Sequence, residues 1–584
     1  MDFRTSVTAG IFRHAACVAA AFLGGLPAAA AEGERDSELA RQMQQYDVVA
    51  TKSIRELQPF RESTQAERAD GTRIELVSLN PNFGRWFLLD ITPGEGRQRT
   101  RSYHIEAASP EKWKLTLARG DDPALIFERG ETRHECRPWA GNSSSLEAAQ
   151  SSALPYAPIC DSRAYLRNRV RGSRTNREAV AEFLRDNVAF GDSIVGLIKG
   201  AFYEDAFMKS GEVVDNADAG QVARSLGRAT LSRHPVINTY FGFELEGAQG
   251  RRMEAGSWYA IKDAPGIYAS AMQPGMIHPD ILNRKGETNW LDNIERRADV
   301  YLVAFDLSQF EIGYEVGTDH PRLGWSSRPH GAGRNWNIPG PDGIDSAAPL
   351  VRTGMLSPAM ADRVAATFTG GFKRDHGAFK YSNYATFNHG HHYGFISNGV
   401  VLSKLQPNLS TLYVLDDGSI HMRTWREEDE DLLPRILFAR QNGVPLIAPD
   451  PETGEGVPGQ FVRSWGGGNW SGSANADLRT LRAGACMKTV EGRQFLIYAY
   501  FSTATPSAMA RTFQAYGCDY AMLLDMNSLE HTYMALYTQE EDRLVPHHLV
   551  SGMAQIDDRR RDGTPIPRFV GFSDNRDFFY LLRK

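Results

Sequence analysis

Alternating apolar and polar residues dominate the chain between Arg73 and Glu135. The runs RIELVSL, RWFLLDI, SYHIEAA, WKLTLA and ALIFE are separated there by turn residues. A period of two, rich in β-branched and aromatic side chains, is typical of antiparallel strands. We therefore expect a β-rich domain over residues 71–160, and a ligand-binding sandwich is one form open to it.

A helical pattern follows the low-complexity stretch GNSSSLEAAQSSALP. Thr175 and Glu178 form a capping box. Apolar residues then recur on one helical face: Val180, Phe183, Leu184 and Val188. This predicts a helical segment over residues 161–230. The motif FGDSIV at 190–195 is similar to a GDSL hydrolase motif, but that nucleophile needs a preceding buried strand, so Ser193 is not expected to be catalytic.

From about Pro235 the chain returns to strand patterns such as VINTYFGFELE and DVYLVAFDLSQFEIGYEVG. A long stretch rich in Gly, Pro and Asn interrupts them between Leu323 and Leu350, and long loops of this kind are often functional. Trp325 and Trp336 within it either stack on a sugar or pin the loop to the body. Both alternatives remain open from the sequence.

The segment from Leu481 to Ser528 has the most informative order of elements. Two strands are followed by a helix that begins at Thr505-Pro506-Ser507 and ends at Gly517. The apolar strand AMLL comes next, with Asp525 at its end. A carboxylate at the end of a buried strand is held rigidly beside a cleft in α/β scaffolds. The sequence thus predicts α+β architecture, with a C-terminal mixed α/β domain over residues 231–584.

A pair of glycines and two hairpins precede that segment. In AATFTGGFK, Gly370 and Gly371 follow an apolar strand and let the backbone turn sharply near a ligand. Asn398-Gly399 and Asp417-Gly418 are strong hairpin signals.

These blocks together resemble the phosphodiester glycosidase family, which includes the enzyme that uncovers mannose 6-phosphate. The resemblance covers roughly residues 250–584 and implies that Asp525 is the essential carboxylate and Arg482 the anchor of a phosphate. It also implies that Gly370, Gly371, Arg482 and Asp525 converge on one cleft. An ion pair between Arg482 and Asp525 would keep the carboxylate ionised.

The sequence departs from the family pattern at several positions. Thr369 stands where the family has asparagine, and Ala483 replaces a hydroxyl residue. Met526, Asn527 and Ser528 replace glycines and serine after the aspartate. Thr369, Asn527 and Ser528 retain groups that form hydrogen bonds with a substrate.

The resemblance implies a secreted hydrolase of glycosidic or glycosyl-phosphodiester bonds, acting on a saccharide or envelope glycan. The alternative is a non-catalytic protein of carbohydrate binding or exopolysaccharide assembly that retains the fold. The departures from the family pattern are compatible with that alternative.

Composition and charge limit the kinds of partner that this chain is expected to bind. The net charge is -6 with 23% charged residues, and the basic residues are scattered, so a nucleic-acid partner is not expected.

Residues 1–31 have the charged, apolar and small-residue regions of a cleavable signal peptide. Residues 32–70 are expected to form a polar linker. No later segment reaches the roughly 20 apolar residues that a membrane span needs. We therefore expect a secreted or periplasmic protein.

Four cysteines remain after removal of Cys17 with the signal peptide. In an oxidising compartment, the simplest pairing is Cys136–Cys160 and Cys486–Cys518. Four free thiols are the alternative.

Cofactor signals are weak. His389, His391 and His392 lie in NHGHHYG without an adjacent carboxylate, so site-lining or surface histidines are favoured over a metal site. The GGGNWSGS loop presents Trp470 to a sugar but lacks the lysine and helix of a phosphate-binding loop. No cofactor is expected, and a divalent cation remains open.

Overall fold

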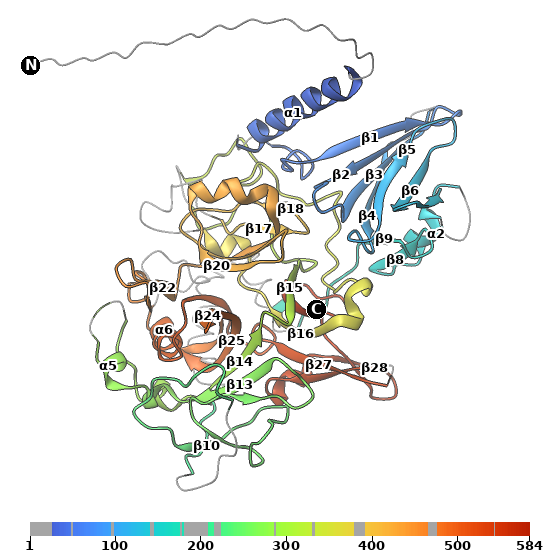
Figure 1. Ribbon diagram of the computed structural model, residues 1–584. Coiled ribbons are helices and arrows are strands. Elements are labelled where there is room, and N and C mark those ends of the chain that lie inside the picture. Colours follow the sequence, from blue (N-terminus) through green and yellow to red (C-terminus); the bar gives the residue numbers. More distant parts are fainter. Residues whose placement is uncertain are drawn as a thin grey trace, which may run out of the picture.

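Antiparallel pairing dominates the computed structural model (Figure 1). The structure describes residues 26–47, 51–94, 99–140, 145–175, 178–179, 208–214, 223–284, 286, 288–329, 333–378, 392–464, 476–541 and 543–584. Within these residues the strands form seven sheets, and all of their strand pairs are antiparallel.

The N-terminal sheets have their own apolar core. One sheet has the order β1-β2-β3-β4-β9-β8 and a second the order β5-β6-β7. Alternate apolar residues such as Leu76, Leu89 and Phe127 pack between them. The strands are β1 (Glu62–Glu67), β2 (Arg73–Ser78), β3 (Trp86–Thr92), β4 (Arg101–Ala107), β5 (Lys114–Ala118), β6 (Ala124–Arg129), β7 (Thr132–Cys136), β8 (Tyr156–Ile159) and β9 (Ala164–Arg167). The strands predicted from alternation are β2 to β6, while β1 lies in the segment expected to be a polar linker.

A larger core unites three further sheets. The eight-stranded sheet contains β12 (Tyr259–Ala260), β13 (Ile267–Met272), β14 (Val300–Asp306), β25 (Arg493–Ala504), β24 (Thr480–Val490), β26 (Tyr520–Met526), β22 (Ile447–Pro449) and β23 (Gly456–Pro458), in that order. One five-stranded sheet contains β15 (Phe310–Glu315), β31 (Phe578–Arg583), β16 (Val364–Thr369), β27 (Met534–Glu540) and β28 (Arg543–His548). The other contains β18 (Val400–Ser403), β17 (Phe395–Ser397), β21 (Ile436–Gln441), β19 (Ser410–Leu415) and β20 (Ile420–Thr424).

Small elements complete the described chain. Two-stranded sheets pair β10 (Val236–Asn238) with β11 (Arg252–Glu254) and β29 (Asp558–Arg559) with β30 (Pro565–Ile566). The α-helices are α1 (Leu26–Asp47), α2 (Leu146–Ser151), α5 (Pro279–Leu282) and α6 (Pro506–Ala515). The 3-10 helices are η1 (Pro274–Met276), η2 (Glu295–Arg297), η4 (Pro358–Arg363), η5 (Arg374–Gly377), η8 (Glu427–Arg435) and η9 (Ser551–Gln555). Among the described helices, none is long and apolar enough to cross a membrane.

The predicted α+β class is wrong, because the described residues are mostly antiparallel β-sheet with few helices. Strand β26 follows β25 and α6, as in a parallel β–α–β unit. However, β24 lies between β25 and β26 and pairs antiparallel with both. The C-terminal part is therefore not a mixed α/β domain.

The predicted helical segment at 161–230 is also not supported. Its described parts contribute β9, isolated bridges at Ser173, Val213 and Ala223, and two helical residues, Glu178 and Ala179, of which the Glu178 amide donates to the Thr175 hydroxyl. The expected helical face from Val180 to Val188 and the motif at 190–195 lie outside the described residues.

Predictions about individual turns and helix ends agree with the structure better than the predicted fold class does. Helix α6 begins after Thr505, whose side chain accepts a hydrogen bond from the Ala508 amide. Gly517 adopts a positive φ of 66° just after this helix, as expected of a glycine that ends one. Hairpins turn between β17 and β18 and between β19 and β20, as predicted.

Both predicted disulfides are present. Cys136 is bonded to Cys160, and Cys486 to Cys518. The second bond joins β24 to Cys518, three residues after the end of α6, so it ties the helix to the sheet on which it packs.

A buried arginine joins the N-terminal sheet to the larger core. Arg167 of β9 pairs with Glu106 of β4 and donates to Glu315 of β15 at 2.8 Å. Its guanidinium lies 4.5 Å from the ring centroid of Trp86. One positive charge therefore faces two carboxylates in a dry interior.

This arrangement predicts a pH-dependent stability. Burial, opposed by Arg167 and reinforced by Glu106, raises the pKa of Glu315 from 4.5 to about 7. The folded state thus holds the proton more tightly than the unfolded chain does. The stability from this group is complete below about pH 4.5 and is lost as the pH rises through about 7.

Urea unfolding across that range tests the prediction. Glu315→Gln mimics the protonated form, so it should reduce the fall in the free energy of unfolding between about pH 4.5 and 7. Glu311→Gln, on the same strand but half-exposed, should keep the wild-type slope. An unchanged slope in Glu315→Gln would contradict the assignment.

Candidate active site

Asp525 lies near the end of β26 and is almost fully buried, with 5% of its surface exposed. Its Oδ1 accepts the Met526 amide at 2.8 Å, and its Oδ2 forms an ion pair with Arg576. Burial raises the pKa of Asp525, while the charge of Arg576 opposes the rise. The carboxylate is therefore held rigidly in a dry environment beside a fixed cation.

Arg576 connects Asp525 to a second carboxylate. Its Nη2 donates to Glu178 Oε1 at 2.6 Å, and the side chain of Asn575 donates to the same oxygen at 3.0 Å. Although burial opposes both charges, their mutual attraction raises the pKa of Arg576 and lowers that of Glu178. We call this arrangement the Asp525–Arg576–Glu178 chain.

Lys373 lies beside this chain. The residue is 6% exposed, and burial together with the charge of Arg576 lowers the pKa of its ammonium group. Glu178 and Asp525 partly offset this effect. A lysine with a lowered pKa near buried carboxylates is a common feature of functional sites, although structural networks show it too.

The glycine pair lies next to the same site. A Cβ atom on Gly370 would come within 2.7 Å of Asp577 Oδ2, and one on Gly371 within 2.6 Å of the Asn442 side chain. Asn442 accepts the Phe372 amide at 2.9 Å and donates to the carbonyl of Leu523 at 2.5 Å. It therefore fixes the glycine turn directly against the strand of Asp525.

Asp577 fixes the other side of the turn. This fully buried carboxylate accepts hydrogen bonds from Tyr314 at 2.7 Å and Arg440 at 2.6 Å and lies 2.6 Å from His320 Nδ1. Burial opposes its charge, but Arg440 and His320 lower the pKa of Asp577. Its backbone carbonyl accepts the Gly370 amide at 2.9 Å.

Arg482 is not part of this constellation. It lies opposite Met526 in the strand register, and its Nη1 is 2.9 Å from the Met526 sulfur. Because successive residues of a strand point to opposite faces, Asp525 points away from Arg482. The guanidinium donates to the carbonyls of Ala504 and Leu478, and burial lowers its pKa to about 10. The expected Arg482–Asp525 ion pair is therefore wrong, and Arg576 takes that place.

Three of the predicted substrate-binding residues lie around the site, and they differ in whether their polar side-chain groups already have hydrogen-bond partners. The Thr369 hydroxyl donates to the carbonyl of Glu530 at 3.3 Å, and Asn527 accepts from Thr480 at 3.3 Å. The hydroxyl oxygen of Ser528 is buried and has no hydrogen-bond partner in the described part of the chain. Ser528 is thus the one with an unused polar group.

The tryptophans of the long loop behave differently from each other. Trp325 donates to the carbonyl of Ile338 at 3.0 Å and packs edge-on against His392, so it pins the loop. Trp336 is 75% exposed, with the Arg334 guanidinium 5.3 Å from its ring centroid. Of these two tryptophans, Trp336 is the exposed one.

Other predicted residues lie outside the described chain, namely Trp470, His389 and His391. His392 is buried and accepts the Ser326 amide. In the residues that the structure covers, no three His, Cys, Asp or Glu side chains form a group able to hold a metal ion. The sequence leaves open the use of a divalent cation, and these residues do not test it.

Sequence reasoning missed Arg576, Asp577 and the site role of Glu178. The run SDNRD lies directly before the apolar strand FFYLL. Charged residues next to a buried strand are also the signal by which the sequence indicates Asp525. Glu178 had been noticed only as a capping residue. Glu178 and Arg576 are 398 positions apart in the sequence.

Comparisons with known proteins give only distant likenesses. No family model matches the chain, and no curated protein matches it. The catalytic domain of zebrafish N-acetylglucosamine-1-phosphodiester alpha-N-acetylglucosaminidase, auto-inhibited by its pro-peptide, matches with a TM-score of 0.30 and 11% identity, over 55% of this chain and 85% of that one. A candidate exported protein from Burkholderia pseudomallei matches with a TM-score of 0.22 and 8% identity, over 49% and 74%. Likenesses of this size support no conclusion about activity.

Proposed function

We propose that this protein is a hydrolase of glycosidic or glycosyl-phosphodiester bonds, with its active site at Asp525. The observation that supports the proposal is the Asp525–Arg576–Glu178 chain beside the glycine turn and Lys373. It combines a rigid carboxylate with two cationic side chains in a water-poor environment. Charges fixed in this way stabilise a charged transition state more strongly than they would in water.

The chemistry assigns different tasks to these groups. Hydrolysis at the sugar C1 passes through an oxocarbenium-like centre, which an adjacent carboxylate stabilises. A departing phosphate carries negative charge, and guanidinium and ammonium groups stabilise it. Asp525 suits the first task, while Arg576 and Lys373 suit the second.

Arg482 does not take the phosphate-anchoring role that the family resemblance implies. The Arg482–Asp525 pair that the resemblance implies does not form, because the two side chains point to opposite faces of the sheet. The proposal now depends on Arg576 in its place. Arg482 is assigned to holding the start of β24 against the end of β25.

A non-catalytic carbohydrate-binding protein is the second candidate. Both oxygens of Asp525 are occupied, by the Met526 amide and Arg576, as in a purely structural ion pair. The exposed indole of Trp336 suits stacking on a sugar, which requires no catalysis.

An activity screen separates the two candidates. Purified protein is incubated with glycosyl phosphodiesters and with capsular or exopolysaccharide preparations, and reducing sugar is measured alongside retention of the glycan. Release of reducing sugar supports the hydrolase. Retention without release supports the binding protein.

The same proposal places the protein in the periplasm or outside the cell. Its two disulfides are of a kind that persists in oxidising compartments. Glycans of the envelope are present there as substrates.

A further inference from the structure

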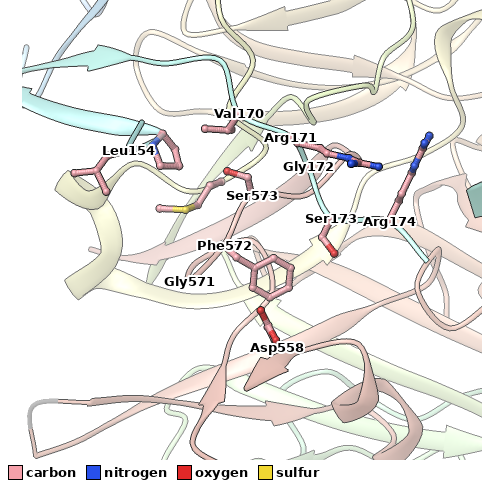
Figure 2. A pocket seen from close by; sticks show the side chains of 12 residues that line it. Leu154, Val170, Arg171, Gly172, Ser173, Arg174, Asp558, Gly571, Phe572 and Ser573 are labelled. Atoms are coloured by element: carbon pink, nitrogen blue, oxygen red, sulfur yellow. The ribbon is translucent and has the colours of Figure 1, made fainter. Parts of the chain in front are cut away.

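A pocket of about 670 Å³ lies between the N-terminal sheet and the segment before β31. Figure 2 shows residues from both sides, with Val170 and Arg171 following β9 and with Phe572 and Ser573 from the C-terminal segment. The pocket is separate from Asp525, which does not line it.

Two paired segments connect this pocket to the candidate active site. The Ser173 amide donates to the Ser573 carbonyl at 2.8 Å, and the Asn575 amide donates to the Ser173 carbonyl at 3.1 Å. Each segment continues from the pocket to a member of the Asp525–Arg576–Glu178 chain. Three extended residues span about 10 Å, so the chain places Ser573 within about that distance of Arg576.

The pocket contains polar groups without partners. Arg171 is exposed and forms no ion pair within the described residues. The Ser573 side chain is 9% exposed, yet its hydroxyl oxygen has no hydrogen-bond partner there. A buried hydroxyl without a partner destabilises the protein, and a bound ligand would supply that partner.

The charge and shape of the lining indicate the kind of ligand. Arg171 contributes a positive charge to the lining and Asp558 a negative one. A guanidinium binds a carboxylate through two parallel hydrogen bonds. Phe572 and Met355 add apolar surface for the C–H face of a ring, and Asp558 offers acceptors for hydroxyl groups.

We propose that this pocket is a subsite that binds a carboxylated sugar residue of an acidic glycan. The inference rests on the proposed function, because it names the class of glycan on which the proposed hydrolase acts. The carboxylate is bound by Arg171 and a ring hydroxyl by Ser573.

Calorimetric titration with a uronic-acid oligosaccharide, such as hexagalacturonate, tests the subsite. The full-length Asp525→Asn protein is used as the background, so that any turnover does not disturb the measurement. We expect Arg171→Gln to weaken binding about tenfold, the effect of losing one charge-assisted contact of about 1.4 kcal/mol. Ser573→Ala removes a hydroxyl with no intramolecular partner, so it should weaken binding several-fold without lowering the melting temperature.

Two controls make the result specific. Arg73→Gln alters an exposed arginine of β2 that does not line the pocket, and it should leave affinity unchanged. A neutral glucose hexamer should bind at least tenfold more weakly than the uronate. Absence of uronate binding, equal binding of the neutral hexamer, or full affinity in Arg171→Gln would each overturn the subsite.

The outcome is independent of the test for catalysis. If wild-type protein cleaves a small glycosyl phosphodiester but does not bind the uronate, the subsite is wrong and the proposed function stands. If the uronate binds as predicted and no glycan is cleaved, the subsite stands and the hydrolase assignment is wrong.

Discussion

Replacing Asp577 by asparagine is expected to lower the free energy of unfolding by about 3–5 kcal/mol, the usual cost of breaking a buried ion pair. The carboxylate is fully buried and forms close contacts with Arg440, His320 and Tyr314. Its loss leaves the Arg440 guanidinium buried without a countercharge. Urea unfolding monitored by tryptophan fluorescence gives the difference.

A matched substitution controls for the loss of one negative charge. Asp121 is exposed in the loop before β6, so Asp121→Asn should change the free energy of unfolding by less than about 0.5 kcal/mol. A similar small change in Asp577→Asn would show that the buried network does not stabilise the glycine turn.

Replacing Asp525 by asparagine is expected to lower turnover of a cleaved glycan by about two or more orders of magnitude, the scale of a positioned acid–base group. The amide is nearly isosteric with the carboxylate. Arg576 retains Glu178 as a counterion, so the fold should persist. Initial rates of reducing-sugar release, measured with circular dichroism of the same samples, provide the test.

The exposed Asp431 serves as the control for this experiment. Asp431→Asn should keep wild-type turnover. Full activity in Asp525→Asn would make Asp525 a scaffold residue and would remove the centre of the proposed site.

Local features of the sequence predicted local structure well. The Thr505 cap and Gly517 define α6, and the Asn-Gly and Asp-Gly pairs mark two hairpins. Each of these depends on backbone preferences within a few residues. The same holds for Asp525, whose position at the end of an apolar strand is visible in the sequence.

Strand order and side-chain direction could not be predicted in this way. Strand β24 inserts between β25 and β26, which makes the sheet antiparallel and sends Arg482 to the face opposite Asp525. The partner of Asp525 is instead Arg576, 51 positions away, and that arginine also binds Glu178. Pairings at such separations depend on topology, because a shift of one residue in register reverses the face of every side chain.

Hydrolysis of a glycosyl phosphodiester in ¹⁸O-labelled water tests the central claim most directly. Attack at the sugar carbon places the label on the C1 hydroxyl of the released sugar and leaves the phosphomonoester unlabelled, whereas attack at phosphorus places it on the phosphate. ³¹P NMR and mass spectrometry distinguish the two products. The glycosidase account predicts label on the sugar alone; label on the phosphate, or no cleavage by the wild-type protein, would contradict it.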